Sequence, residues 1–117
     1  GIFMTMDKSL LTGSTSMLLL KLLEEKDMYG YMMIEELSKK SDNTFVLKAG
    51  TLYPLLHTLE EKEFVTSYEK NSHTGRQRKY YAITKKGKQH LNEKREQWQQ
   101  YTSAVNNVLK GGMTFAY

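Results

Sequence analysis

A central helix is the clearest element that the pattern of hydrophobic and polar residues predicts. Four leucines within residues 48–65 repeat at i, i+3, i+4 and i+7, which is the spacing of one apolar helix face. These leucines are Leu52, Leu55, Leu56 and Leu59. The residues of the opposite face are Gly50, Tyr53, Pro54 and His57. Two interpretations are open: an ordinary amphipathic helix with a solvated outer face, or a helix that enters a DNA major groove.

Two residues mark the expected ends of this helix. Pro54 has no amide hydrogen and fits where none is needed, so we place it in the first turn. That position puts the N-cap near Thr51, or up to three residues earlier. At the other end, Glu63 stands where a residue in the left-handed conformation would close the helix, although Gly or Asn adopts that conformation more easily.

Two helices and a strand are predicted ahead of the central helix. Residues 10–25 are apolar around most of their girth, so we expect this helix to pack on its own domain and on a partner. Asp27 is placed to cap a second helix over 28–40, in which Gly30 leaves room for a close helix approach. The run TFVL at 44–47 is typical of a short extended strand.

The pattern after the central helix predicts a hairpin and then a long helix. Two runs rich in β-branched and aromatic residues, 64–69 and 79–84, flank the turn-forming segment 70–78, which indicates a β-hairpin with a long, flexible tip. Thr84 is expected to cap a helix over 85–110, which at about 26 residues would be roughly 39 Å long. A small domain cannot cover such a helix, so we expect its apolar heptad stripe to pack against a second copy.

The charges are unevenly distributed along the chain, whose net charge is +4. Residues 70–90 contain no Asp or Glu. The bases of this segment are Lys70, Arg76, Arg78, Lys79, Lys85, Lys86 and Lys88. A block of one sign beside a candidate recognition helix is typical of a phosphate-binding surface.

Composition excludes several other classes of protein. The 117 residues include no cysteine, which excludes disulfides, thiolate catalysis and zinc sites built on cysteine. His57, His73 and His90 lie on different predicted elements without metal-binding spacing, and the sequence has no glycine-rich phosphate loop. We therefore expect no enzyme activity, no metal and no cofactor. No apolar run approaches the roughly 18 residues of a membrane span, and the start lacks a signal-peptide pattern, so we expect a cytoplasmic protein.

The order of the elements indicates a winged helix-turn-helix, in which one helix enters the major groove and the hairpin tip touches the backbone or minor groove. The predicted fold is mainly α with a small β-hairpin. Residues 1–84 are expected to form the winged helix-turn-helix DNA-binding domain. Residues 85–110 are expected to form a C-terminal dimerisation helix, followed by a loose tail at 111–117.

The chain resembles the PadR family of bacterial winged-helix transcriptional regulators in three blocks, YGYMMIEEL (29–37), GTLYPLLHTLEEKEFV (50–65) and GRQRKYYAITKKGKQHL (75–91). Its single helix after the hairpin resembles the short members, which dimerise through that helix. The resemblance implies a repressor that responds to a ligand or signal, often one that controls a transporter or detoxification operon. Glu63 departs from the family pattern, because many members have Gly at that position.

DNA-binding residues are expected on the central helix and on the hairpin. Those of the helix and its start are Lys48, Thr51, Tyr53, Pro54 and His57. Those of the hairpin are Arg76, Gln77, Arg78 and Lys79. Hydroxyl groups donate to phosphates or base edges, and arginines offer planar, forked donors to phosphate or a narrow minor groove. The alternatives are an inert surface histidine at His57 and a merely solvated charged loop in the hairpin.

The expected partners are double-stranded DNA with a palindromic operator and a second copy of the chain. The residues expected in the dimer interface are Leu11, Leu18, Leu91, Trp98, Tyr101, Val105 and Val108. In some multidrug-responsive relatives, aromatic residues of this last helix line a flat cavity between the subunits. The resemblance therefore implies that Trp98 and Tyr101 could bind a planar aromatic effector, whereas Trp98 as an interface filler is the other interpretation.

A winged-helix protein that binds another protein rather than DNA is the alternative function. It would be favoured if acids in the fold neutralised the bases of residues 70–90, or if DNA binding were salt-sensitive and blind to sequence.

Overall fold

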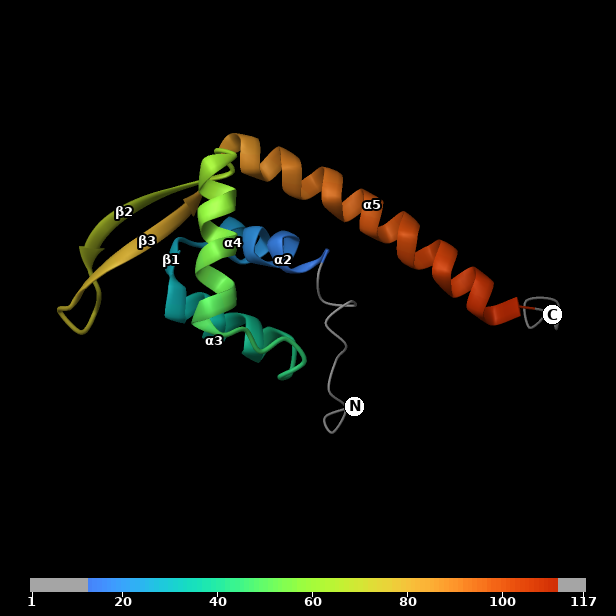
Figure 1. The fold of residues 1–117 in the computed structure, drawn as a ribbon, viewed down its shortest axis with the longest axis horizontal. Helices are drawn as coiled ribbons and strands as arrows, with labels where there is room; N and C mark the ends of the chain where they lie inside the picture. Colours follow the sequence, from blue (N-terminus) through green and yellow to red (C-terminus); the bar gives the residue numbers. More distant parts are fainter. Residues whose placement is uncertain (1–12, 112–117) are drawn as a thin grey trace.

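The computed structural model describes residues 13–111, which form four helices and one sheet (Figure 1). The helices are α2 (Thr15–Glu25), α3 (Gly30–Lys40), α4 (Ala49–Glu61) and α5 (Lys85–Lys110). The strands are β1 (Met28–Tyr29), β2 (Val65–Asn71) and β3 (Gln77–Ile83). This arrangement confirms the predicted fold class, a mainly helical winged helix-turn-helix with a long C-terminal helix.

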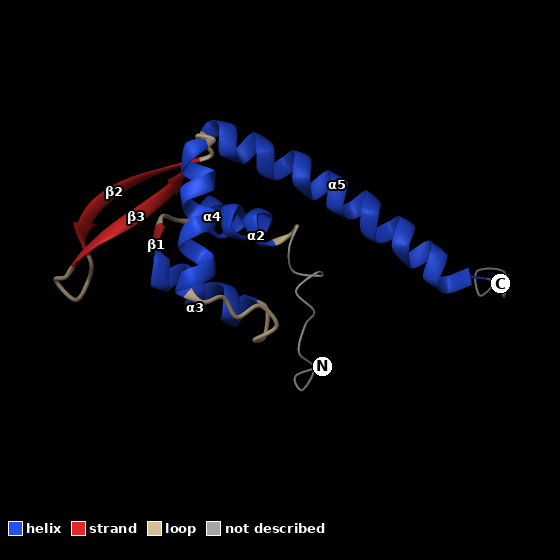
Figure 2. Ribbon diagram, viewed as in Figure 1, coloured by secondary structure: helices blue, strands red, loops and turns tan. Residues whose placement is uncertain are grey.

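The three strands form one antiparallel sheet in the order β1-β3-β2 (Figure 2). β2 and β3 make the predicted hairpin, but their pairing continues to Asn71 opposite Gln77, so the loop is 72–76 rather than 70–78. A hydrogen bond of 2.8 Å from the Ser72 amide to the Arg76 carbonyl closes this loop. The tip of the hairpin is therefore shorter than predicted and is held by its own backbone.

Residues 44–47 form a loop and not the predicted strand. Phe45 and Leu47 are half-buried against the core, whereas Thr44 and Val46 are exposed. This alternation is the one expected of a strand, but none of the described strands pairs with the segment. The sheet takes its third strand from β1 instead.

The pairing of β1 with β3 also moves the start of α3. Because both residues of β1 are extended, α3 begins at Gly30 with Tyr29 as its N-cap. The prediction that Asp27 caps this helix is therefore wrong. The Asp27 carboxylate instead accepts a hydrogen bond of 2.6 Å from the Tyr68 hydroxyl. The helix predicted over 10–25 begins at Thr15, after a turn, and residues 10–12 lie outside the described part of the chain.

The start of α4 lies at the early limit of the prediction. The helix begins at Ala49 with Lys48 as its N-cap, three residues before Thr51, so Pro54 lies in the second turn and not in the first as predicted. Pro54 cannot donate a hydrogen bond to the carbonyl four residues earlier. Both Gly50 and Pro54 are exposed, so water can reach that carbonyl.

A hydrogen-bonded junction joins the end of α4 to the start of α5. Glu63 has a left-handed φ of 65°, although we expected a residue other than Gly or Asn to weigh against a tight cap here, and the Phe64 amide donates to the Leu59 carbonyl at 2.9 Å. The Thr84 hydroxyl donates to the Glu63 carbonyl at 2.7 Å and accepts from the Gly87 amide at 2.9 Å, so Thr84 caps α5 as predicted.

The core draws buried side chains from every helix and strand of the described chain. Three of the four predicted leucines of α4 are buried and Leu55 is half-buried, which confirms the apolar face of that helix. The cluster consists of Leu19, Leu20, Leu22, Leu23, Met28, Met33, Leu37, Leu52, Leu56, Leu59, Val65, Tyr81 and Leu91. Each such residue stabilises the fold by about 1.5–3 kcal/mol when it leaves water.

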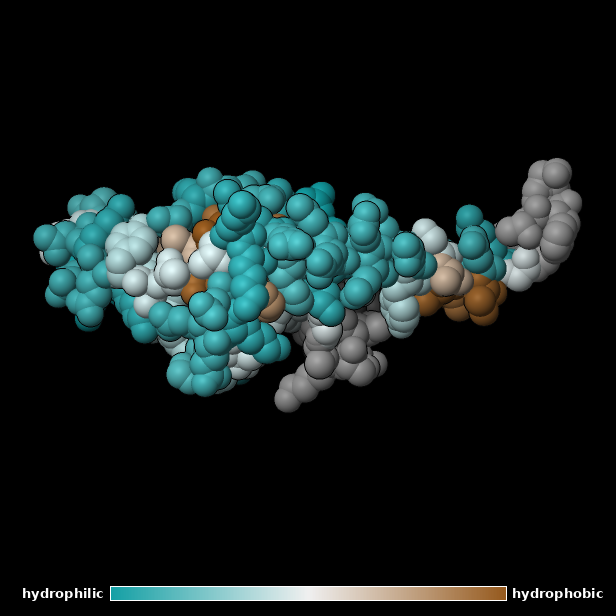
Figure 3. Space-filling view, turned by 90° about the horizontal axis from the view of Figure 1, so that it is seen from above, coloured by the Kyte–Doolittle hydropathy of each residue, from teal (hydrophilic) through white to brown (hydrophobic). Residues whose placement is uncertain are grey.

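The long helix α5 leaves this core and extends far beyond it (Figure 1). The molecule measures 60 Å along its longest axis and 22 Å along its shortest. Hydrophobic residues lie on the surface near the C-terminal end of α5, including Val105, Val108 and Leu109 (Figure 3). Among the described residues, none of the helices is both long and apolar enough to cross a membrane.

Candidate nucleic-acid interface

The polar face of α4 is exposed to solvent, as the leucine spacing predicts. Thr51, Pro54 and His57 are exposed, and Lys48 is exposed just ahead of the helix. His57 has Glu61 one turn away, with 3.6 Å between Nε2 and the carboxylate, so the two form an ion pair only when the imidazole is protonated. The face can therefore reach a ligand without any rearrangement of the core.

Tyr53 is bound more closely to its own fold than a freely exposed residue would be. It is 41% exposed, yet its hydroxyl and ring lie against Gly30 at the start of α3, where an added Cβ would overlap the hydroxyl oxygen and the adjoining ring carbon. Burial raises the pKa of Tyr53, and the nearby Tyr31 and Tyr81 raise it further, so the hydroxyl stays a hydrogen-bond donor. The close approach predicted for Gly30 is confirmed, and Tyr53 is the residue that makes it.

The predicted DNA-binding residues of the hairpin are divided between its loop and strand β3. Arg76 is exposed in the loop, and Gln77 is the first residue of β3. Arg78 lies further along β3 and is half-buried, so it is not beside Arg76 at the tip as predicted. Lys79 lies 4.0 Å from the Glu60 carboxylate of α4, which also accepts a hydrogen bond of 2.6 Å from Ser67.

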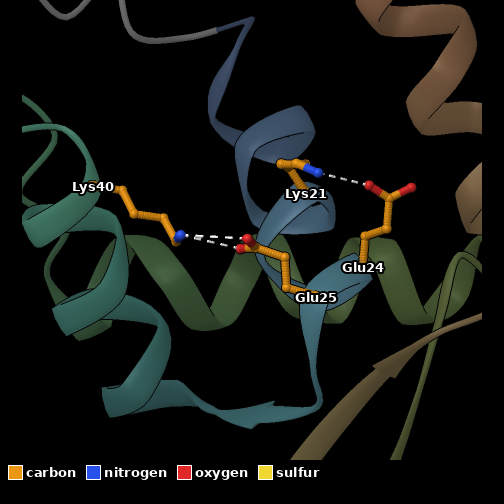
Figure 4. Close-up of polar contacts among 4 residues, drawn as sticks. All are labelled: Lys21, Glu24, Glu25 and Lys40. Atoms are coloured by element: carbon orange, nitrogen blue, oxygen red, sulfur yellow. Dashed lines mark hydrogen bonds and ion pairs between the residues drawn. The ribbon is translucent and has the colours of Figure 1, made fainter.

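The bases of residues 70–90 keep most of their charge uncompensated. Among the described residues, Lys79 is the only member of this block within 4.0 Å of an acid. The acids of α2 pair elsewhere: Glu24 with Lys21 at 2.9 Å, and Glu25 with Lys40 of α3 at 3.3 Å (Figure 4). The neutralisation that would favour a protein-binding module is therefore not found in the described part of the chain.

The outer face of the sheet carries a group of aromatic residues that sequence reasoning missed. Tyr80 makes an edge contact with Tyr29 at 5.3 Å between ring centres and stacks on Tyr68 at 5.8 Å. The hydrogen bond to Asp27 raises the pKa of Tyr68 to about 12. The period of two in each strand could show which tyrosines share a face, but only the register of all three strands places them side by side.

A hollow of about 390 Å³ lies between the start of α2 and the middle of α5. Its lining residues are Gly13, Ser14, Met17, Lys94, Gln97, Trp98 and Tyr101. The two predicted effector-binding residues thus lie at one site, with 6.0 Å between the ring centres of Trp98 and Tyr101. The planes of the two rings are tilted by 30° to each other.

The residues predicted for the dimer interface fall into three groups. Leu91 is fully buried in the core of its own chain, so a partner cannot contact it, and that prediction is wrong. Leu18 is half-buried against the same core, and Leu11 lies outside the described residues. The remaining residues lie exposed along α5: Trp98, Tyr101, Val105 and Val108.

An exposed helix face beside an uncompensated basic hairpin, on a core of helices and a three-stranded sheet, defines a winged-helix DNA-binding protein. The profile of the PadR-like family of transcriptional regulators matches residues 19–93, and the chain belongs to this family. Members of the family regulate transcription by binding DNA and are not enzymes.

Solved structures and relatives support the same placement. A transcriptional regulator from Clostridium thermocellum has a TM-score of 0.80 at 30% identity, covering 87% of this chain and 96% of its own. A PadR-like regulator from Bacillus cereus has a TM-score of 0.79 at 33% identity, with 89% and 99% covered. Transcriptional regulator YqjI of Escherichia coli is 29% identical over 73% of this chain, which spans only 39% of that longer protein.

Proposed function

We propose that the protein is a sequence-specific repressor that acts in the cytoplasm as a homodimer on a palindromic DNA operator. The observation that carries this proposal is the continuity between the polar face of α4 and the hairpin. Lys79 of β3 lies 4.0 Å from the Glu60 carboxylate of α4, and Arg78 of β3 is close enough to Tyr53 of α4 to oppose the larger effect of burial on the pKa of that tyrosine. One surface therefore joins a helix suited to base edges with a hairpin suited to phosphates.

The residues of this surface have different tasks in the proposal. Tyr53 and His57 face the bases from the exposed side of α4, while Lys48 and Thr51 meet phosphates at the start of that helix. The exposed Arg76 makes the backbone or minor-groove contact from the loop of the hairpin. The other contacts of the proposed surface are Pro54, Gln77, Arg78 and Lys79.

The distal part of α5 supports the proposal of a homodimer. Tyr101 and Val108 are 64% and 78% exposed, and they recur at the spacing of a helix seam. A second copy that packs along this seam by two-fold symmetry would remove the apolar surface from water. Two-fold symmetry in turn places two copies of α4 on half-sites about 34 Å, or a multiple, apart.

The hollow beside Trp98 supports the proposal that a ligand controls DNA binding. A planar aromatic or cationic compound would gain contact with Trp98 and Tyr101, which lie at the same site. In a dimer it would also alter the spacing of the two α5 helices and hence of the DNA-reading helices. Release of DNA from a transporter or detoxification operon by such a compound is the regulation that we propose.

The decisive experiment uses the intergenic DNA upstream of the gene. A palindrome there should bind the purified protein, and the log–log dependence of affinity on salt should have a slope of order −6 for three or four contacts per subunit. Tyr53→Phe removes only the hydroxyl while the ring stays against Gly30, so a loss of about 1–3 kcal/mol for the palindrome would assign that hydroxyl to recognition. Equal affinity for scrambled DNA would instead support the protein-binding alternative.

The dimer and the effector have separate tests. Val105→Asp places a charge in the proposed seam and should yield monomers in light scattering, whereas Lys110→Asp at the end of α5 should leave the dimer intact. A planar compound that quenches Trp98 fluorescence and releases the operator should lose its effect in Trp98→Ala, which should still bind DNA. Release of DNA from that variant would place the effector elsewhere.

A further inference from the structure

Arg78 is held by an aromatic ring and not by any polar partner. Its guanidinium carbon lies 4.9 Å from the centre of the Tyr29 ring, at the junction of β1 and α3. Within the described residues, no hydrogen bond or ion pair uses its side chain, and its Nε is buried without a partner. The side chain is therefore fixed in place while its donors stay unused.

Ring contact and hydrogen bonding use different parts of a guanidinium. Its flat face contacts the ring, whereas its five N–H groups lie along the edge. Contact with Tyr29 thus restricts a long side chain without consuming a donor that a phosphate would need. A ligand that binds such a pre-arranged group loses less conformational entropy on binding.

Tyr29 is itself fixed by the tyrosine ladder, the name used here for the rings of Tyr29, Tyr80 and Tyr68. The ring of Tyr80 contacts Tyr29 on one side and stacks on Tyr68 on the other. At the far end of the ladder, the Tyr68 hydroxyl donates to the Asp27 carboxylate at 2.6 Å. The ladder therefore ties the chain segment before α3 to both strands of the hairpin.

The surroundings of Arg78 favour an anion. Tyr29, whose ring the guanidinium contacts, is the N-cap of α3, and the first turn of that helix contains no acid that would oppose an anion. None of the described ion pairs reaches Arg78. Lys79, its neighbour in β3, is by contrast beside Glu60.

We propose that Tyr29 is a positioning residue for DNA binding, which holds Arg78, near the loop end of β3, as a fixed ligand for a backbone phosphate. This contact is separate from that of Arg76 in the exposed loop. The inference rests on the proposed function, because it takes the phosphate to belong to bound DNA. Arg78 contributes the N–H groups, and Tyr29 contributes by limiting where they point.

A double-mutant cycle tests the pair with a labelled, mixed-sequence duplex of about 24 base pairs at about 50 mM salt, where phosphate contacts dominate affinity. Arg78→Ala should weaken binding about tenfold and reduce the salt slope by about one per subunit. Tyr29→Leu should weaken binding about three- to fivefold with an unchanged slope, since the charge remains. The double variant Tyr29→Leu, Arg78→Ala should bind like Arg78→Ala alone.

Conservative variants separate positioning from support of the fold. Tyr29→Phe keeps the ring and should bind within about twofold of wild type. Arg78→Lys keeps the charge but not the planar fork, and should weaken binding by nearly as much as Arg78→Ala. Lys110→Ala removes one charge at the far end of α5, away from the hairpin, and serves as the control. Should Tyr29→Leu not fold by circular dichroism, Tyr29→Met supplies the second ring-free variant.

Each remaining outcome has a distinct meaning. If the losses of binding free energy in the two single variants added up in the double variant, Tyr29 would not act through Arg78. If Arg78→Lys bound like wild type, Arg78 would contribute its charge only and not its planar donors. Full binding by Arg78→Ala, with wild type bound, would remove Arg78 from the interface and leave the proposed function standing. A wild-type protein that binds neither this duplex nor the upstream DNA would overturn the proposed function itself.

Discussion

The two parts of α5 share one predicted heptad stripe, which runs from Leu91 to Val108, but have opposite surroundings. In the proximal part, residues 85–91, Gly87 is buried and Leu91 is 0% exposed. In the distal part, residues 92–110, Val108 is 78% exposed, and the large aromatic residues also face solvent. A heptad stripe shows that one face of a helix is apolar. It does not show whether the same chain or another molecule covers that face.

The proximal part belongs to the winged-helix core, and the distal part is the face that we propose for the dimer. Leu91 packs in the cluster that unites all the described helices and strands, while His90 stacks on Phe64 with 4.1 Å between ring centres. Beyond that point, residues 94–101 of α5 contribute to the lining of the hollow beside α2, and the helix then extends beyond the core (Figure 1). Stability of the domain and assembly of the dimer should therefore respond to different substitutions on one helix.

The largest expected effect separates the two parts of α5 directly. Leu91→Ala leaves a cavity in the core and should lower the free energy of unfolding by about 2–5 kcal/mol. Val108→Ala should change the unfolding of a monomeric variant by less than about 0.5 kcal/mol, because the side chain is exposed there. Urea denaturation of both variants in the Val105→Asp background measures this difference. Equal losses would mean that the distal part also packs on its own chain.

A second prediction concerns the junction that holds α5 against the hairpin. A Cβ at Gly87 would overlap the Phe64 carbonyl and approach the Ile83 side chain to 2.9 Å, so Gly87→Ala should cost about 1–3 kcal/mol. The matched control is Gly50→Ala, also in a helix but with no atom within 4 Å of the added Cβ, which should be stabilising by about 0.5–1 kcal/mol. If both variants unfolded at the same denaturant concentration, the junction would be looser than the structure indicates.

The sequence predicts the elements of the fold better than their exact limits. The leucine spacing of α4 and the alternation in the hairpin identify their buried faces, because a regular period of apolar residues rarely arises by chance. The pattern predicts a third strand at 44–47, where Phe45 and Leu47 have the right alternation, whereas the true strand is only Met28–Tyr29. Two residues are too few to show a period, and their pairing with β3 depends on tertiary structure.

The sequence predicts the residues of the candidate site but not its geometry. The exposed face of α4 follows from helix periodicity, and the basic block follows from counting charges. The contact of Arg78 with Tyr29 joins residues about 50 positions apart, and the hydrogen bond from Tyr68 to Asp27 joins residues 41 positions apart. Such contacts depend on strand register, which a hairpin of uncertain loop length leaves open.

A third and smaller effect is expected at the end of α4. Glu63 has a φ of 65°, a conformation that glycine adopts without strain, so Glu63→Gly should stabilise the winged-helix domain by about 0.5–1 kcal/mol. Glu63→Ala removes the same side chain but keeps the strain, and it should bring no such gain. Thermal unfolding of the two variants measures the contribution of the backbone. A gain in both would point to the charge of Glu63 instead.

The smallest expected effect is a pH dependence of the free energy of unfolding that arises from His90 in the proximal part of α5. Burial against Phe64 lowers the pKa of His90 below its ordinary value, Lys94 and Lys62 lower it further, and Glu93 partly opposes them. The folded state therefore binds a proton less readily than the unfolded chain, whose histidine pKa is about 6.5. The stability from neutral His90 is present above that pH and is lost as pH falls through it toward the folded pKa. Wild type should then lose more stability in urea than His90→Phe between about pH 7.5 and 5.5, while dimerisation through the distal part is the same in both. Parallel losses in the two proteins would show that the stack with Phe64 does not disfavour the charged imidazole.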